Sequence, residues 1–296
     1  MRPLSWSDLP GWEDDDHAAA LAAFSVTADL AGGPLPKPGT DPRAFFETHF
    51  EPLELTPQGA HFTGYYEPEL PGSRQPSARF SHALYAIPAG IEPETPWFSR
   101  AEITAGNLLA GQELVYLETA IEAFLAQVQG SLRVRLEDGS SLRLGFAGKN
   151  GHPYRSIGKE LVARGIAPAA EMTPERIRLW CAENPGAVPE LLNTNPSFVF
   201  FRLLDLPETA GPPGAMGRPV SPGRSLAIDP DFVPLGSPVW IESPRIGARL
   251  VVAQDIGSAI RGLGRGDLFF GSGPDAGRHA GALNEAGRMV VLRRRP

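Results

Sequence analysis

The chain has 296 residues, which is enough for one large domain or two smaller ones with a full hydrophobic core. Its 33 Gly and 31 Pro exceed average usage, while 42% hydrophobic and 21% charged residues exclude a disordered chain. The net charge of −7 excludes nucleic acid as a partner, because nucleic-acid binders carry a basic face. We therefore expect a turn-rich globular protein with more strand than helix.

A single cysteine, Cys181, excludes an internal disulfide framework and a cysteine-based metal cluster. The six histidines follow no metal-ligand spacing, so neither a metal nor a cofactor is expected. No stretch reaches the ~18 apolar residues of a membrane-spanning helix. The first residues lack the apolar run of a signal peptide, which leaves a cytosolic protein or a mature chain whose leader has been removed.

Residues 1–60 are predicted to form helices and loops, with one helix after the acidic run 13–16 and another over 41–50. Short strands are expected over 62–68 and 80–87. Ser99 and Glu102 have the spacing of a capping box, which begins a helix. The apolar spacing of residues 114–128 then predicts helix as far as Gly130.

A hairpin is predicted from strands 132–136 and 142–146, because the turn between them contains Asp138-Gly139. Helices are expected over 157–164 and 173–183. From Ser197 onward the chain is almost wholly β in pattern. The short apolar runs are 198–203, 225–228, 238–241, 250–253, 268–270 and 289–292. Their even spacing between Gly and Pro turns predicts a closed barrel.

Three aspartates, Asp229, Asp255 and Asp267, each stand at the start or end of one of these apolar runs. An aspartate there can end a strand by bonding the local backbone, or it can belong to a functional site, and both interpretations stay open at this point. The glycine-rich run 271–277 lacks the Lys-Ser/Thr of a phosphate-binding loop. We expect it to form a glycine-lined wall beside a bulky ligand. Residues 146–157 have the polar and aromatic composition of a binding loop.

Ordered motifs between Phe62 and Leu292 carry a resemblance to a known family. They are FTGYY at 62–66, GKNG at 148–151, YRSIG at 154–158, NPSFVFF at 195–201, GRSLAID at 223–229, PLG at 234–236, DIGSAIRG at 255–262 and GDLFFG at 266–271. The chain resembles the membrane-bound lytic transglycosylase A family of peptidoglycan-cleaving enzymes, whose C-terminal part is called the three-aspartate domain.

The resemblance implies a mainly β protein with a double-psi β-barrel and peripheral helices. Both chain ends, residues 1–70 and 197–296, would form the barrel, with the three-aspartate region at about 216–292. Residues 71–196 would form a smaller inserted β-rich domain, and the glycan strand would lie in the groove between the two.

The implied activity is cleavage of the MurNAc-β-1,4-GlcNAc bond without water. The C6 hydroxyl of MurNAc attacks its own C1, which leaves a 1,6-anhydro end. Matched motif to motif, Asp267 takes the place of the single catalytic acid and base, with Asp255 and Asp229 as its companions. One of these two is expected to raise the pKa of Asp267, since a free aspartate titrates near 3.9.

The matching motifs also carry the residues that the resemblance implies for substrate binding. These are Thr63, Tyr65, Lys149, Asn150, Tyr154, Ser156, Ser197, Gly257 and Gly271. The implied partners are peptidoglycan glycan strands and other cell-wall enzymes, and the implied form is a monomer in the periplasm that can associate with the outer membrane.

Two features depart from the family pattern. The start lacks a lipoprotein-type cysteine, which leaves the membrane anchor of the family unaccounted for, and Gly257-Ser258-Ala259 replaces its usual Gly-Gly-Ala. Two other functions remain open. One is a water-using glycoside hydrolase on the same kind of barrel, which would need two acids. The other is a glycan-binding module without catalysis.

Overall fold

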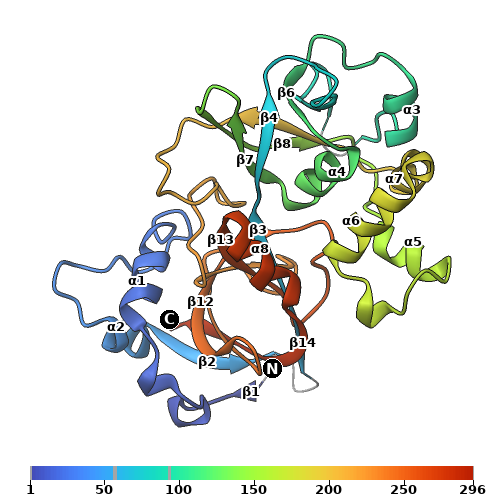
Figure 1. Ribbon diagram of the computed structural model, residues 1–296. Helices are drawn as coiled ribbons and strands as arrows, with labels where there is room; N and C mark the ends of the chain where they lie inside the picture. The colour runs from blue at the N-terminus through green and yellow to red at the C-terminus, as the bar shows by residue number, and fades with distance from the viewer. Residues whose placement is uncertain (1, 56–58, 93–94, 296) are drawn as a thin grey trace. The chain divides into compact units, whose positions relative to one another are not determined.

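The computed structural model describes residues 2–55, 59–92 and 95–295 (Figure 1). The chain divides into two compact units. Unit 1 combines the two chain ends, Met1–Tyr66 and Glu208–Pro296, and unit 2 is the segment Glu67–Pro207. In the part of the chain that is described, no helix has both the length and the apolar character needed to cross a membrane.

The main sheet of unit 1 closes on itself as a six-stranded barrel, in the order β14-β11-β12-β10-β13-β3 and back to β14. The strands are β3 (Ala60–Glu67), β10 (Ser225–Ile228), β11 (Pro238–Ser243), β12 (Gly247–Ile256), β13 (Arg265–Ser272) and β14 (Asn284–Arg294). The β10–β12 pair is parallel, whereas β10–β13, β11–β12, β11–β14 and β14–β3 are antiparallel. The closed barrel confirms the predicted fold class.

The barrel wall has an apolar inner face and a partly covered outer face. Residues of all six strands, among them Phe62, Leu226 and Leu268, form the core inside the barrel. Because side chains alternate along a strand, their neighbours point outward. On part of the outer face, Trp240 and Val252 pack with residues from the N-terminal helices. Leu226, Trp240 and Val252 are fully buried.

The elements that flank the barrel come mostly from the first 60 residues. Helices α1 (His17–Ser25) and α2 (Pro42–His49) lie beside β12 and β2 (Phe50–Glu54), and β1 (Arg2–Pro3) pairs with β2 (Figure 1). Short 3-10 turns η1 (Trp6–Asp8) and η2 (Trp12–Asp14) precede α1. The side chains of Asp16 and Asp41 cap α1 and α2, so these acids precede the helices and do not lie in their first turns.

Helix α8 (Gly273–Ala282) contains most of the glycine-rich run 271–277. From Gly273 the run is the first turn and a half of this helix, and its place beside a ligand stays a prediction. Gly277 serves the packing of the helix, because a Cβ there would lie 2.8 Å from the ring of Tyr66. Glycine is needed here for close approach within the protein.

Unit 2 has its own six-stranded sheet in the order β5-β6-β4-β7-β8-β9. The strands are β4 (Glu69–Ser73), β5 (His82–Tyr85), β6 (Glu113–Leu117), β7 (Ser131–Leu136), β8 (Ser141–Lys149) and β9 (Val199–Leu203). The helices are α3 (Arg100–Ala105), α4 (Ala120–Gln129), α5 (Ile157–Ala163), α6 (Pro174–Glu183) and α7 (Val188–Asn193), with 3-10 turns η3 (Ala169–Glu171) and η4 (Pro185–Ala187). The β7–β8 hairpin, α5 and α6 confirm their predictions.

Two elements of unit 2 differ from the sequence-based expectation. The helix predicted from residue 114 is wrong in its first part, where the chain forms β6, and α4 begins after the N-cap Thr119. The apolar residues of β6 fit helical spacing by coincidence, because short apolar runs suit either structure. Strand β9 was assigned to the barrel, but it pairs with β8 and extends the sheet of unit 2. The unit therefore ends at Pro207 and not near residue 196.

Candidate functional site

Strand register brings two of the three aspartates to the same level of the barrel. Ala227 of β10 pairs with Asp255 of β12 on one side and with Asp267 of β13 on the other. Neighbouring strands lie about 4.8 Å apart, so the two aspartate backbones are separated by roughly 10 Å. Side chains of paired residues share a face of the sheet, which places both carboxylates over Ala227.

These side chains belong to the outer face of the barrel. Phe62, Leu226 and Leu268 fill the interior, so the residues that follow or precede them, Thr63 and Asp267 among them, point outward. Tyr65 lies two residues after Thr63 on β3, so its side chain points to the same face. The outer face of β12, β10, β13 and β3 therefore gathers hydroxyl and carboxyl groups from residues 190 and 204 positions apart in the sequence.

A β-bulge places Asp255 on this face. Leu226 pairs with Ala253, but Ala227 pairs with Asp255, so Gln254 is an extra residue in β12. Since Ala253 belongs to the interior core, simple alternation would have directed Asp255 inward as well. The bulge thus re-aims a carboxylate that would otherwise enter an apolar core.

Gln254 holds the bulge in place through three hydrogen bonds. Its amide nitrogen donates to the carbonyl oxygen of Ala23 at 2.8 Å and to the hydroxyl oxygen of Thr27 at 2.9 Å. Its amide oxygen accepts from the Ser225 hydroxyl at 2.5 Å. Gln254 is buried, so these bonds satisfy its polar atoms away from water and tie β12 to α1.

Asp267 lies on β13. Protein atoms surround its carboxyl, and the residue keeps partial access to solvent. The pKa of its carboxyl is raised to about 6: burial has the largest effect, Thr63 and Arg265 lower the pKa, and the nearby charge of Asp255 raises it. The hydroxyl of Thr63 donates to Oδ1 of Asp267 at 2.5 Å. Below pH 6 this carboxyl is largely protonated, which is the state that a general acid requires.

Asp255 accepts three hydrogen bonds. The Tyr65 hydroxyl donates to Oδ2 at 2.8 Å, and the backbone N–H groups of Ala215 and Ile256 donate to Oδ1 at 3.0 and 2.9 Å. Burial nevertheless raises the pKa of Asp255 to about 6. Burial also raises the pKa of Tyr65 well above its usual value, so this hydroxyl remains a donor. Both oxygens of Asp255 are thereby engaged by the protein.

Asp229 follows β10 and has a different environment. The backbone N–H of Gly262 donates to Oδ2 at 2.7 Å, and Arg261 approaches Oδ1 at 3.4 Å. These contacts, the bond from Gly262 foremost, lower the pKa of Asp229. An ionised carboxylate suits the anchoring of the 257–264 loop and does not suit proton donation.

The two aspartates that the sequence offers as neighbours of Asp267 differ in their contacts. Asp255 is the aspartate whose charge raises the pKa of Asp267, although burial has the larger effect. Asp229 is occupied with its own loop.

Two predicted glycines have backbone reasons for their identity. Gly271 adopts φ +109°, a backbone conformation that residues other than glycine rarely adopt. A Cβ on Gly257 would lie 2.8 Å from the Ile260 side chain, so the tight turn after β12 needs a glycine.

The remaining predicted residues lie in unit 2, near the end of β8. Asn150 is buried, and its amide nitrogen donates to the carbonyl oxygens of Phe98 and Pro196 at 2.8 and 2.9 Å. Its amide oxygen accepts from the N–H of Phe198 at 2.8 Å. Asn150 therefore holds three backbone segments together. Lys149, one residue earlier, is part of the β8–β9 ladder and is partly exposed.

Ser156 and Ser197 also make local structural contacts. Ser156 caps α5, where its hydroxyl oxygen accepts from the N–H of Lys159 at 3.3 Å. Ser197 is buried, and its carbonyl oxygen accepts from the Arg100 guanidinium at 2.6 Å. Tyr154 is partly buried, which raises the pKa of its hydroxyl. Among the five residues predicted in unit 2, Lys149 and Tyr154 are partly exposed, and the contacts described above give neither side chain a part in helix capping or backbone support.

Sequence reasoning missed two contributors to the aspartate site. Arg265 stands two residues before Asp267 on the same face of β13, and its guanidinium donates to the Thr63 hydroxyl oxygen at 2.6 Å. The i, i+2 spacing of a charged residue before the aspartate was a usable signal. Ala215 contributes a backbone N–H from a distant loop, for which the sequence offers no signal.

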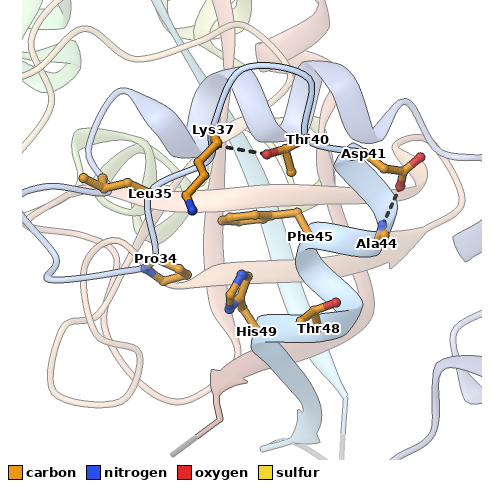
Figure 2. Close-up of a pocket in the computed structure, with 9 residues that line it drawn as sticks. All are labelled: Pro34, Leu35, Lys37, Thr40, Asp41, Ala44, Phe45, Thr48 and His49. Atoms are coloured by element: carbon orange, nitrogen blue, oxygen red, sulfur yellow. Dashed lines mark hydrogen bonds between the residues drawn. The ribbon is translucent and has the colours of Figure 1, made fainter.

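A hollow of about 390 Å³ lies beside α2 in unit 1. Its lining residues are far in the sequence from the three aspartates. Figure 2 shows the ring of Phe45 between Lys37 and His49 at this hollow. Its lining comes from residues 34–49 and includes none of the predicted site residues. We assign it no part in the site.

Comparison with known proteins gives two family models in sequence order. The MltA specific insert domain matches residues 61–202, and the 3D domain matches residues 224–293. Membrane-bound lytic murein transglycosylase A of Escherichia coli K12 is 38% identical over 250 residues, which cover 79% of this chain and 66% of that relative. The match thus spans slightly less than two thirds of the length of the E. coli protein.

Two solved structures are similar over nearly the whole chain. The lytic transglycosylase LtgG of Burkholderia pseudomallei is 41% identical with a TM-score of 0.64, covering 99% of this chain and 95% of that one. E. coli MltA with bound chitohexaose is 32% identical with a TM-score of 0.74, covering 95% of this chain and 84% of that one. The closed barrel, the aspartates on its outer face and these matches all indicate the same family. The chain belongs to the membrane-bound lytic murein transglycosylase A family.

Proposed function

We propose that this protein is a peptidoglycan lytic transglycosylase, which cleaves the MurNAc-β-1,4-GlcNAc bond and leaves a 1,6-anhydroMurNAc end. The observation that carries the proposal is Asp267, a carboxyl whose pKa burial raises to about 6, on the outer face of the barrel. Its relatives bear the name of this activity, and one of them binds chitohexaose, a chain of β-1,4-linked amino sugars. A periplasmic location follows from the substrate.

The mechanism needs one acid and no water. Asp267 gives its proton to the glycosidic oxygen as the bond from C1 to that oxygen breaks. The C6 hydroxyl of MurNAc then bonds to C1 and returns its proton to the same carboxylate, which restores the enzyme. Because the nucleophile belongs to the substrate, positioning replaces much of what a second carboxylate supplies in a hydrolase.

Asp255 is proposed to be the companion that keeps Asp267 protonated. Its charge raises the pKa of Asp267, and Tyr65 and two backbone N–H groups hold it in place. Asp229 is proposed to act at a distance by fixing the loop that contains Gly257 and Gly262.

The site favours this mechanism over a water-using hydrolase. A hydrolase would need a second carboxylate free to activate water or attack the sugar. Both oxygens of Asp255 accept hydrogen bonds from the protein, and Asp229 is bonded to Gly262. A binding module without catalysis would have no use for a carboxyl with a raised pKa.

Sugar contacts in unit 2 are proposed for Lys149 and Tyr154, which are partly exposed. Asn150, Ser156 and Ser197 are proposed to shape that binding segment through the bonds described above. Thr63 and Tyr65 of β3 are proposed to act through their hydrogen bonds to the aspartates.

The proposal is tested by incubating the protein with purified murein and weighing the soluble products. We expect ends that are one water lighter than reducing ends. Asp267→Asn should abolish them while binding to murein in a sedimentation assay persists. Asp275→Asn, an exposed aspartate on α8, is the matched control and should behave as wild type. Products with reducing ends would show a hydrolase, and an active Asp267→Asn variant would refute the assignment of the acid.

A further inference from the structure

Arg265 is connected to the catalytic carboxyl through one hydroxyl. Its guanidinium donates through Nη2 to the Thr63 hydroxyl oxygen at 2.6 Å and through Nη1 to the carbonyl oxygen of Gly266 at 2.6 Å. A longer bond of 3.3 Å from Nη1 reaches the carbonyl oxygen of His61. Bonds to β3 and β13 together fix the position of this charged group.

The chemistry of these groups decides the direction of each hydrogen bond. A guanidinium can only donate, so the Thr63 oxygen accepts from Arg265. The single hydrogen of the Thr63 hydroxyl is then directed to Asp267, whose Oδ1 lies 2.5 Å away. Oδ1 is therefore always an acceptor, whether Asp267 is charged or neutral.

This direction places the acidic proton on the other oxygen. When Asp267 is neutral, Oδ1 already accepts from Thr63, so the proton resides on Oδ2. Among the described residues, Oδ2 has no hydrogen-bond partner within the protein. It is thus the oxygen that remains available for an incoming glycosidic oxygen.

We propose that Arg265 is a positioning residue, which orients the Thr63 hydroxyl and thereby fixes the transferable proton of Asp267 on Oδ2. The proposal rests on the proposed function, because it concerns the proton that the lytic reaction transfers. Without the guanidinium, the Thr63 hydroxyl can rotate and either donate to Asp267 or accept from it. The neutral carboxyl then divides its proton between the two oxygens.

Arg265 also acts through its charge. The groups that affect the titration of Asp267 come from three strands: Thr63 of β3, Arg265 of β13 and Asp255 of β12. Tyr65 of β3 faces both aspartates and stays neutral. Arg265 opposes the effect of burial and of Asp255 on the pKa of Asp267, so its removal should raise that pKa.

The first test compares Arg265→Gln with wild type in kcat and KM across pH, on soluble glycan chains. We expect kcat to fall about tenfold or more with little change in KM, since proton orientation matters in the transition state. The basic limb of the pH profile should move to higher pH. Arg265→Lys keeps a cationic donor, so its basic limb should lie at the wild-type pH and its kcat should recover in part. Arg245→Gln, which removes an exposed arginine near Glu285, is the matched control.

The second test asks whether Arg265 acts through Thr63. Thr63→Val removes the hydroxyl, so in its background Arg265→Gln should cause a much smaller loss of kcat than in wild type. Fully additive losses, or a wild-type pH profile in Arg265→Gln, would overturn the proposal. If Arg265→Gln fails to fold, Arg265→Lys and Thr63→Val carry the comparison: the first should lose part of the kcat and the second more, and a wild-type kcat in both would overturn the proposal too.

A titration of carbon-13-labelled aspartate carboxyls by NMR separates this proposal from the proposed function. The Asp267 signal, identified by its loss in Asp267→Asn, should titrate at higher pH in Arg265→Gln than in wild type. This readout requires no catalysis. If the wild-type protein forms no anhydro ends, the proposed function is refuted. If it forms them but Asp267 titrates at the same pH in wild type and in Arg265→Gln, the role of Arg265 is refuted.

Discussion

The three aspartates of the barrel differ in the hydrogen bonds that their carboxylates accept. Asp229 receives a short backbone bond from Gly262, which lowers its pKa. Asp255 and Asp267 are enclosed by protein atoms, and burial raises the pKa of each to about 6. The same residue type therefore has a lowered pKa at one position and a raised pKa at the other two, because the surroundings differ.

Replacing Asp255 by Asn should lower the pKa of Asp267, because it removes the negative neighbour that favours the neutral acid. The basic limb of the pH–rate profile should move to lower pH by up to about one unit. The measurement is the pH dependence of anhydro-end formation. Asp229→Asn is the comparison: it should leave the limb in place, and an equal shift in both variants would contradict the assignment.

Asp267 should also lower the stability of the folded protein at neutral pH. Its folded pKa lies above the unfolded value, so its favourable contribution is present below about pH 4 and is lost as pH rises through 6. Asp267→Asn should then raise the free energy of unfolding at pH 7.5 by at most about 3 kcal/mol, and hardly change it at pH 4. Urea unfolding of both proteins at the two pH values measures this. A gain that is equal at both pH values would exclude titration as its cause.

At the scale of secondary structure, the bulge in β12 is the feature that makes the site. It changes the alternation after Ala253, so that Asp255 joins Asp267 on the outer face. Turns and caps elsewhere follow local rules, as in the capping box of Ser99 and Glu102. The bulge follows no such rule, because its support comes from α1, more than two hundred residues away in the sequence.

Gln254→Ala should loosen the bulge, because it removes the acceptor of the buried Ser225 hydroxyl and the amide that donates to the Ala23 carbonyl oxygen. We expect a loss of about 2–4 kcal/mol in the free energy of unfolding, together with a lower kcat. Denaturant unfolding and activity measure the two effects. Thr27→Val removes one of the three bonds and should cost less; equal losses would argue against the bulge as a unit.

At the scale of the whole molecule, a buried ion cluster joins the two ends of unit 2. The chain enters the unit at Glu67 and leaves it at Pro207. Arg143 donates to the Glu67 carboxylate at 2.9 Å and to the Pro207 carbonyl oxygen at 2.7 Å, and Arg133 donates to Glu67 at 2.7 Å. Glu67 is fully buried. One guanidinium thus holds both connections of the inserted segment.

Glu67→Gln should destabilise unit 2 by about 3–5 kcal/mol, because it leaves Arg143 buried without its counter-charge. The double variant with Arg143→Met should lose less than the sum of the two single losses. Denaturant unfolding of the full chain provides the measurement. Arg79→Gln, which breaks an exposed ion pair with Glu118, is the control and should cost under about 1 kcal/mol. Additive losses would show that the cluster does not act as a unit.

Local patterns in the sequence determined many elements of this protein. The turn at Asp138-Gly139, the caps of α1, α2 and α6, and the short strands between glycines and prolines depend on residues close together in the chain. The motifs around Asp255 and Asp267 determined the family. These features are visible in the sequence because backbone preferences and hydrogen bonds to neighbouring residues act over a few positions.

Tertiary structure alone decided how the site is arranged. Strand pairing placed β9 in the second sheet, and the bulge at Gln254 turned Asp255 outward. Burial raises the pKa of Asp267 to about 6, whereas the backbone hydrogen bond from Gly262 lowers the pKa of Asp229. The bond from Arg265 through Thr63 joins β3 to β13 across about two hundred residues of sequence. Register, solvent exclusion and such long-range bonds exist only after the chain has closed the barrel, so the sequence pattern cannot display them.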